Sequence, residues 1–459
     1  MKSSVALALS CLFGVGLSGA ISSQPASPPG KPSRPSPAQP LTLEDAVALA
    51  VRNNETTGIA AARLERARAI RREAYSAFLP ALTATGTYTR RSREVTRTID
   101  DEQIVTQARN ALGTTTVLEW PLFDARAFPV ARSTDRNLEA QEQESHDLTR
   151  VLAFDVAEAY FVVLSAERLL EAARRRLGVA EAVVADAETR LEAGLASRNE
   201  YTRTDLERAQ SRVAVTEAEN AVRINRLNLG YLIGVEAAGP LEEPGPLFAG
   251  SRDPEALARI ARQNRPDLVA LERRAEAARL LAREPGLRFA PRLDASATYR
   301  TTNEPGLSGR EGDWNAGAVL TWELFDGGTR SAQAAARRAE YRDLRLQADA
   351  LRRRIGVEVQ GAAADLDTAE AALAQAEVQV RVALQNEEEV RVRFQEGLAT
   401  ALEQADATVS AFEAQAGLAR QRFALYVAQL ALLERTGGFP LAASAGAAGG
   451  AGAAGKPAP

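Results

Sequence analysis

Three short motifs occur twice in this chain, in the same order, at an offset of a little over 200 residues. The pairs are Phe78–Leu82 with Phe289–Leu293, Trp120–Asp124 with Trp322–Asp326, and Gly194–Ser197 with Gly397–Thr400. Unrelated motifs that return in one fixed order indicate an internal duplication. The fold must therefore be built from two similar repeats.

The repeats are 41–238 and 253–438, and a Gly- and Pro-rich linker at 239–252 joins them at mid-height. Each repeat has the pattern of a first helix of about 35 residues, two strands, a helix of about 67 residues and a third helix of about 38 residues. The first helices are expected at Thr42–Ala77 and Asp253–Glu284.

The long helices are expected at Ala127–Ala193 and Thr329–Glu396, where Ala, Leu, Val, Glu and Arg recur at the spacing of a coiled coil. Such a helix is roughly 100 Å long. The two shorter helices of a repeat together match that length, so we expect them to lie end to end along the long helix. On helix pattern alone, a fibrous coiled coil is the alternative.

Four segments alternate between apolar and polar residues with the period of a β-strand, which argues against a purely fibrous protein. Trp314 and Trp322 fall on one face, about 26 Å apart along a strand. That length is close to the apolar band of an outer-membrane barrel, so Trp120, Trp314 and Trp322 are predicted to lie at the membrane interfaces. The alternative is a soluble hairpin with an aromatic core.

Four strands cannot close a barrel, and lipid does not tolerate open sheet edges. The chain is therefore expected to form oligomers. Two copies would give a filled eight-stranded barrel, whereas three copies would give twelve strands and room for a lumen. A duct needs three copies.

The ends of the chain indicate export. Residues 1–20 have the pattern of a signal peptide, with cleavage expected after Ala20, and a disordered Pro- and Ser-rich leader is expected at 21–40. The Ala- and Gly-rich tail at 439–459 is also expected to be disordered. The one cysteine, Cys11, lies in the signal segment, and its lipidation is an open alternative.

Composition excludes several classes of protein. The 56 basic and 60 acidic residues argue against a nucleic-acid partner. His146 is the only histidine and is expected on a solvated helix surface, so no zinc centre and no cofactor are predicted. Phosphate-binding loops and paired nucleophile and base are absent from the sequence, so no enzyme activity is expected.

The segments Leu41–Asn54 and Arg265–Leu268, together with the repeated motifs, resemble the family of TolC-like outer membrane efflux proteins over nearly all of 41–438. The resemblance implies a homotrimer in the outer membrane. Its twelve-stranded transmembrane β-barrel would continue into an α-barrel of long coiled-coil helices that crosses the periplasm. It also implies two protein partners, a periplasmic adaptor and an inner-membrane pump.

The resemblance also implies functional residues. The tips that contact the adaptor correspond to the two repeated turns, Gly194, Leu195, Ala196, Ser197, Gly397, Leu398, Ala399 and Thr400. The acidic residues of the pore constriction correspond to Glu403 and Asp406, where crowding of like charges is expected to raise at least one carboxyl pKa. The first repeat has Glu200 and Arg203 there, and Ala399 replaces an arginine that is frequent in the family, so no latch built on that position is expected.

Two other classes remain open from the sequence alone. A periplasmic adaptor also carries helical hairpins, and a coiled-coil envelope protein need not form a channel. The transported cargo is not encoded in any motif of this chain.

Overall fold

The computed structural model describes residues 40–99, 102–245, 247–248, 252–304 and 310–438. The expected signal segment 1–20 with Cys11, the leader up to residue 39 and the tail at 439–459 lie outside the described residues. Among the described helices, none is both long and apolar enough to cross a membrane.

The fold is mostly helical with a small antiparallel β part, as the sequence predicted. The first repeat contains α1 (Leu43–Asn53), α2 (Glu55–Ser76), β1 (Ala81–Arg90), β2 (Val95–Ile99), β3 (Glu102–Gln107), β4 (Asn110–Phe123), α3 (Ala127–Glu192) and α4 (Arg198–Ile233). The second contains α5 (Pro254–Asn264), α6 (Pro266–Leu281), α7 (Glu284–Leu287), β5 (Arg292–Thr302), β6 (Gly312–Thr321), α8 (Thr329–Gln395) and α9 (Ala401–Arg435).

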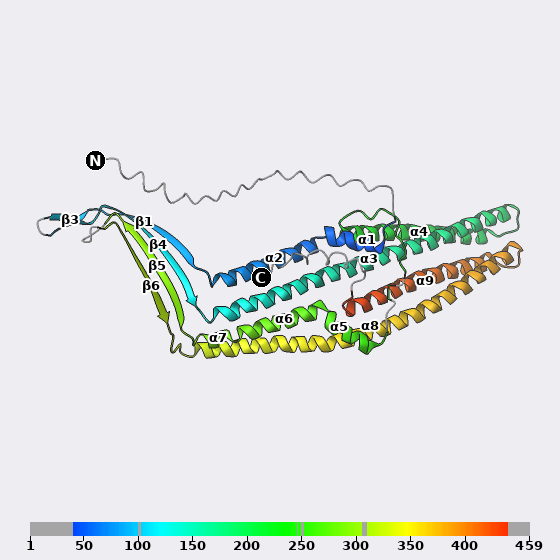
Figure 1. The fold of residues 1–459 in the computed structure, drawn as a ribbon. Helices are drawn as coiled ribbons and strands as arrows, with labels where there is room; N and C mark the ends of the chain where they lie inside the picture. The colour runs from blue at the N-terminus through cyan, green and yellow to red at the C-terminus, as the bar shows by residue number, and fades with distance from the viewer. Residues whose placement is uncertain (1–39, 100–101, 246, 249–251, 305–309, 439–459) are drawn as a thin grey trace, which may run out of the picture. The chain divides into compact units, whose positions relative to one another are not determined.

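Each long helix is accompanied along its length by shorter helices (Figure 1). Helix α3 packs against α1, α2 and α4 of its own repeat, and α8 packs against α5, α6 and α9. Helix α3 also contacts α6 and α9, so it joins the two repeats. The end-to-end arrangement expected from the helix lengths is therefore the one observed.

The first helix of each repeat is broken in two, which the sequence did not predict. Asn54 has an extended backbone between α1 and α2, and its side chain accepts a hydrogen bond from the amide of Thr56. Arg265 is extended between α5 and α6 because the following residue is Pro266, and proline disfavours helix in the residue before it.

Both breaks meet the end of a third helix. Gly234 after α4 has φ +72°, and a Cβ there would lie 2.8 Å from the Cβ of Asn53. Gly437 after α9 has φ +76°, and a Cβ there would lie 3.1 Å from the backbone nitrogen of Arg265. The two repeats therefore close at mid-height by the same contact, and glycine is required at both places.

The strands of both repeats form one antiparallel sheet in the order β1-β4-β5-β6, in which β4 and β5 join the repeats. Strands β2 and β3 form a separate two-stranded ribbon between β1 and β4, which was not predicted. Along β1 and β6 every residue is exposed in the single chain.

Two apolar clusters form the core. One includes Tyr160 and Phe161 of α3 with Leu43 of α1 and Leu229 of α4, and the other includes Ile355 and other residues of α8 with residues of α5 and α9. Elsewhere the buried positions of the long helices are largely alanines, which allow close approach of neighbouring helices. Each long helix therefore organises the core of its own repeat, and α3 in addition contacts the second repeat.

Candidate functional site

The two repeated turns end the long helices in the same way. Gly194 has φ +74° and Gly397 has φ +75°. The amide of Leu195 donates to the carbonyl of Arg190 at 2.8 Å, and the amide of Leu398 donates to that of Arg393 at 2.7 Å. This is the Schellman pattern, in which a left-handed glycine turns the chain out of a helix.

The next helix begins at once in both repeats. The side chain of Ser197 accepts a hydrogen bond from the amide of Glu200 at the start of α4. Thr400 forms a capping box with Glu403, because its hydroxyl accepts from the Glu403 amide and its own amide donates to the Glu403 carboxylate at 2.7 Å. The repeated Gly-Leu-Ala-Ser/Thr motif is thus a helix stop followed by a helix start.

The two turns expose apolar side chains, and a contact between α3 and α8 holds them next to each other. Leu195 is 80% exposed and Leu398 is 66% exposed. Arg190 of α3 donates to the carbonyl of Phe394 in α8 at 3.1 Å, and its guanidinium lies 4.5 Å from the centre of the Phe394 ring. One chain therefore presents two adjacent tips, each with an exposed leucine.

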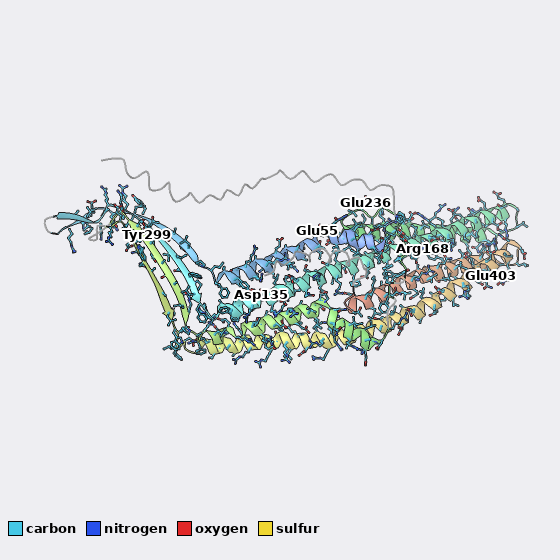
Figure 2. The ribbon with its side chains drawn as sticks, in the orientation of Figure 1. Glu55, Asp135, Arg168, Glu236, Tyr299 and Glu403 are labelled. Carbon is cyan, nitrogen blue, oxygen red and sulfur yellow. The ribbon has the colours of Figure 1, made fainter. Side chains whose placement is uncertain are left out.

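The two predicted pore residues lie on the first turns of α9, and both are exposed. Figure 2 labels Glu403 near the tip of this helix. Hydrogen bonds from the amide and hydroxyl of Thr400 lower the pKa of Glu403. Asp406 lies three residues further along the same helix face. Their role in the pore stays a prediction, and Glu403 also has a role in starting α9.

The sheet register brings the predicted apolar sets to one face. Residues directly opposite in an antiparallel pair point to the same side. Tyr299 lies opposite Trp314 and Thr116, and Leu82 lies opposite Leu118. The face so defined carries Leu82, Ala84, Tyr88, Leu112, Leu118, Trp120, Leu293, Ala295, Ala297, Tyr299, Trp314, Ala316, Ala318 and Leu320. The opposite face carries mostly Thr, Ser, Asn and charged residues.

The tryptophans of the repeated motif have a contact that sequence reasoning missed. The indole nitrogen of Trp120 donates to the carbonyl of Phe78 at 3.3 Å, and that of Trp322 donates to the carbonyl of Phe289 at 3.0 Å. Both partners belong to the repeated Phe-x-Pro motif. The Trp-x-Leu-Phe-Asp and Phe-x-Pro motifs are repeated together in both halves, and this was the sequence signal for a contact between them. The contact joins the end of a strand to the residues that follow a helix. The interfacial role of Trp120, Trp314 and Trp322 stays a prediction.

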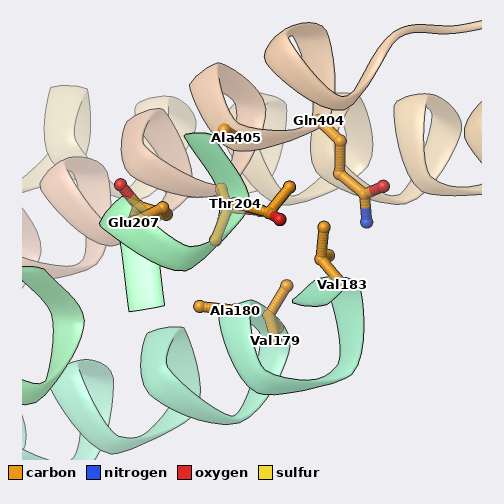
Figure 3. Close-up of a pocket in the computed structure, with 8 residues that line it drawn as sticks. Val179, Ala180, Val183, Thr204, Glu207, Gln404 and Ala405 are labelled. Atoms are coloured by element: carbon orange, nitrogen blue, oxygen red, sulfur yellow. The ribbon is translucent and has the colours of Figure 1, made fainter. Parts of the chain in front are cut away.

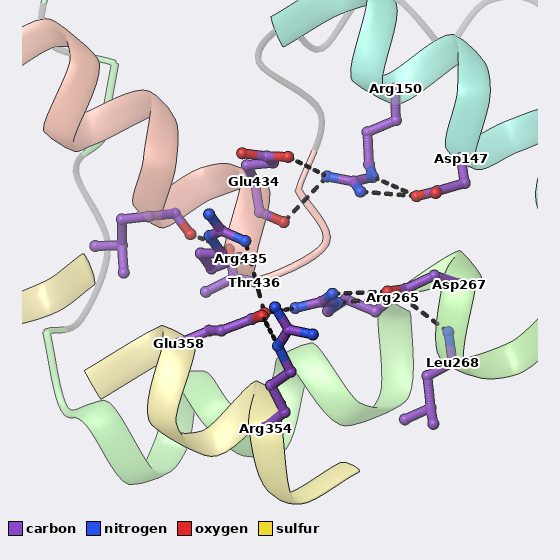
Figure 4. A network of polar contacts seen from close by, with 11 residues as sticks. Asp147, Arg150, Arg265, Asp267, Leu268, Arg354, Glu358, Glu434, Arg435 and Thr436 are labelled. Atoms are coloured by element: carbon purple, nitrogen blue, oxygen red, sulfur yellow. Dashed lines mark hydrogen bonds and ion pairs between the residues drawn. The ribbon is translucent and has the colours of Figure 1, made fainter. Parts of the chain in front are cut away.

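A second missed group is a network of ion pairs at mid-height (Figure 4). The guanidinium of Arg265 donates to the carboxylate of Asp267 at 2.6 Å and to that of Glu358 in α8 at 2.5 Å. Arg150 of α3 contacts Asp147 and donates to the backbone carbonyl of Glu434 in α9. Burial alone would raise the pKa of Asp267, but the hydrogen bonds and charge of Arg265 lower it. The network fastens both repeats where their shorter helices meet.

The described residues contain no group of three or more His, Cys, Asp or Glu that could hold a metal ion. The candidate sites are instead a pair of tips, an acidic helix start and a one-sided apolar sheet.

Comparison with known proteins agrees with this geometry. Residues 47–235 and 257–438 match the family described as outer membrane efflux protein. Protein CyaE of Bordetella pertussis (strain Tohama I) is 29% identical over 348 residues, which cover 74% of this chain and 72% of that protein.

Solved structures share the fold. A membrane protein from Pseudomonas aeruginosa aligns with a TM-score of 0.74 at 21% identity, over 86% of this chain and 90% of that one. The outer membrane protein VceC from Vibrio cholerae aligns with a TM-score of 0.71 at 22% identity, over 86% of this chain and 96% of that one.

The matched family covers most of the chain and both repeats, and solved structures that share its fold are described as outer membrane channels. The chain belongs to the outer membrane efflux protein family, and it is an outer-membrane exit duct of the efflux and secretion class with a long periplasmic helical part.

Proposed function

We propose that three copies of this chain close into one duct, which receives cargo from an inner-membrane pump through a periplasmic adaptor. The observation that carries the proposal is the open sheet. Among the described residues, β1 pairs only with β4 and β6 only with β5, so the outer edges of the sheet are free. Strands β1 and β6 run in opposite directions, so β6 of one copy can pair with β1 of the next in the antiparallel sense.

The helices support the same closure. Gly397 lies 203 positions after Gly194, and at this spacing Phe154 of α3 corresponds to Val357 of α8. Phe154 is buried in the first core cluster, whereas Val357 is 71% exposed. The face of α3 that packs on the second repeat thus has an uncovered equivalent on α8.

The surface that would cover α8 is also present. Leu227 and Tyr231 of α4 are 65% and 78% exposed and border a groove of about 840 Å³. Their equivalents on α9 are Leu430 and Glu434, which lie close to α3. In the closed trimer, α4 of one copy packs on α8 of the next, as α9 packs on α3 within one chain.

The tips are the surface for the adaptor. Leu195 and Leu398 project from two rigid turns, and exposed leucines at the end of a coiled coil offer apolar contacts to a helical partner. Three copies place six tips around one opening. Glu403 and Asp406 then lie just inside that opening and line its constriction.

Closure can be tested with cysteine pairs. Within one chain, Arg150 donates to the carbonyl of Glu434 at 3.1 Å, and the equivalent positions are Arg353 and Tyr231. In a chain whose Cys11 is replaced, cysteines at Arg353 and Tyr231 should cross-link into a covalent trimer upon oxidation.

Each single-cysteine variant should remain a monomer on the same denaturing gel, and cysteines at Arg150 and Glu434 should form a bond within one chain. A ladder that ends at the dimer, or cross-links that do not form in outer-membrane fractions, would contradict the three-fold arrangement.

A further inference from the structure

A small cavity of about 20 Å³ lies where α3, α4 and α9 meet (Figure 3). Its wall on α3 is apolar and is formed by Val179, Ala180 and Val183. Thr204 of α4 and Gln404 of α9 complete it from the other helices. All of the residues that line the cavity belong to one chain.

Gln404 has an unsatisfied atom at this cavity. The residue is 5% exposed, and its Oε1 has no hydrogen-bond partner among the described residues. Figure 3 shows its side chain extending from α9 toward Val183. A buried amide oxygen without a donor is unfavourable, so native proteins supply one from the chain or from an ordered water.

The polar neighbours cannot supply the missing donor, because their own hydrogen bonds are committed. The hydroxyl of Thr204 donates to the carbonyl of Tyr201 at 2.8 Å. The carboxylate of Glu207 accepts from Arg176 and from Ser211. The hydroxyl of Thr408, also at the cavity, is bonded to Glu387.

We propose that the cavity binds one water molecule that bridges Gln404 of α9 to Thr204 of α4, and that this polar layer fixes the register of α9 against α3 and α4. A water can donate one proton to Gln404 Oε1 and the other to the free lone pair of the Thr204 oxygen. The space is sufficient, since a single water needs about 10–15 Å³.

The polar layer is important because the apolar residues around it do not determine the axial register of α9. The buried residues of α9 on either side of Gln404 include Ala401, Ala407 and Ala411, which are small and can slide past one another. A buried polar side chain is satisfied in one alignment only, and single polar residues fix the register of coiled coils in this way. Gln404 therefore aligns the second tip with the first.

Helix α9 offers a matched control. Gln429 is also buried, at 7% exposure, but its Oε1 accepts a hydrogen bond from the amide of Leu247 at 3.1 Å. In the purified full-length protein, Gln404→Leu should leave the thermal midpoint unchanged or raise it. Gln429→Leu should lower the midpoint by several degrees, because the Leu247 amide loses its acceptor. Equal losses in both variants would overturn the proposal, since Gln404 would then have a direct protein partner.

The bridge itself is tested by a double-mutant cycle and by a density map. The change in midpoint caused by Thr204→Val should shrink in the Gln404→Leu background, whereas Thr204→Ser should behave as the unmodified chain does. A high-resolution map should show a peak within hydrogen-bond distance of both side chains. Additive effects, or an empty cavity in the map, would overturn the bridge.

The register is measured separately. Spin labels at Leu195 and Leu398, in labelled chains diluted with unlabelled ones, report the distance between the two tips. Gln404→Leu should broaden this distribution relative to Gln429→Leu variants that remain folded. An unchanged distribution would overturn the register role of the layer.

Discussion

The side chain of Asn54 links α2 to α4, and its replacement by alanine should loosen the mid-height junction. The Oδ1 atom accepts from the amide of Thr56 at 2.9 Å, which caps α2. The Nδ2 atom donates to the carbonyl of Leu232 at 2.9 Å, in the last turn of α4. Asn54→Ala removes both bonds at once.

The expected cost is set by these two bonds. Loss of an asparagine cap costs about 1 kcal/mol. A carbonyl left without its donor costs about 1–3 kcal/mol, so the sum is about 2–4 kcal/mol. Asn54→Asp retains the cap but not the donor, and should lose about 1–3 kcal/mol. Thr42→Ala removes the exposed cap of α1 together with its exposed hydrogen bond to the Asp45 carboxylate, and should lose about 1 kcal/mol.

Hydrogen exchange is the suitable assay because it reports local opening in an assembled membrane protein. Since 1.4 kcal/mol corresponds to a factor of ten, Asn54→Ala should speed exchange at the start of α2 and the end of α4 by roughly 30- to 700-fold. Asn54→Asp should speed exchange mainly at the end of α4. If Asn54→Ala changes hydrogen-exchange rates no more than Thr42→Ala does, or if exchange at the end of α4 is unchanged, the coupling of α2 and α4 through Asn54 is refuted.

Three further predictions concern the sheet, a tip and pH. Single cysteines on the apolar face of the sheet should resist a membrane-impermeant thiol reagent, and single cysteines on the polar face should react with it. The apolar set is Leu293, Ala295, Ala318 and Leu320, and the polar set is Ser296, Thr298, Asn315 and Thr321. Equal rates of modification in the two sets would exclude the barrel. A bulky charged residue at Gly397 should abolish export with trimers intact, at a backbone cost of about 1 kcal/mol, whereas Gly417→Ala, in open helical space, should leave export unchanged. The pKa of Asp267 is lower in the folded chain than in the unfolded chain, so as pH falls the unfolded chain takes up the proton on this carboxylate at a higher pH. The contribution of Asp267 to stability is therefore present above about pH 4 and is lost as pH falls further. Asp267→Asn should therefore flatten the acid limb of the thermal midpoint measured against pH.

The long helices were the most predictable part of the fold. The expected boundaries Ala127–Ala193 and Thr329–Glu396 differ from α3 and α8 by one residue at one end. They were predictable because no proline interrupts either helix beyond its first turn and because a glycine with positive φ ends each one. Local chemistry alone determines such ends.

Most of the features that the sequence did not predict depend on partners distant in the chain, whereas the break at Arg265 has a local cause in Pro266. The stretch around Asn54 has an uninterrupted helical pattern, and its break is stabilised by a carbonyl 178 residues away. The Arg265 network was likewise hidden, since Glu358 lies 93 residues further on. The Gln404 cavity needs three helices to exist at all. Pattern and propensity carry no information on such contacts.

Glu403 and Asp406 were assigned one shared role from the sequence, and the structure gives Glu403 a second one. Crowding alone was expected to raise a carboxyl pKa at the constriction, but within one chain the amide and hydroxyl of Thr400 lower the pKa of Glu403. Its charge therefore persists further into acid, and Glu403→Ala would disturb the start of α9 as well as the pore. Glutamine can serve in a capping box, so Glu403→Gln removes the charge and keeps the cap.

The informative variant is thus Glu403→Gln combined with Asp406→Asn, recorded in planar bilayers. A ring of carboxylates favours cations, so the double variant should lose cation preference and become less sensitive to block by multivalent cations. Glu403→Ala should in addition lower the thermal midpoint, which Glu403→Gln should not. If the double variant keeps the original selectivity and block, Glu403 serves only to start α9, Asp406 is a solvated surface residue, and the constriction is formed by other side chains.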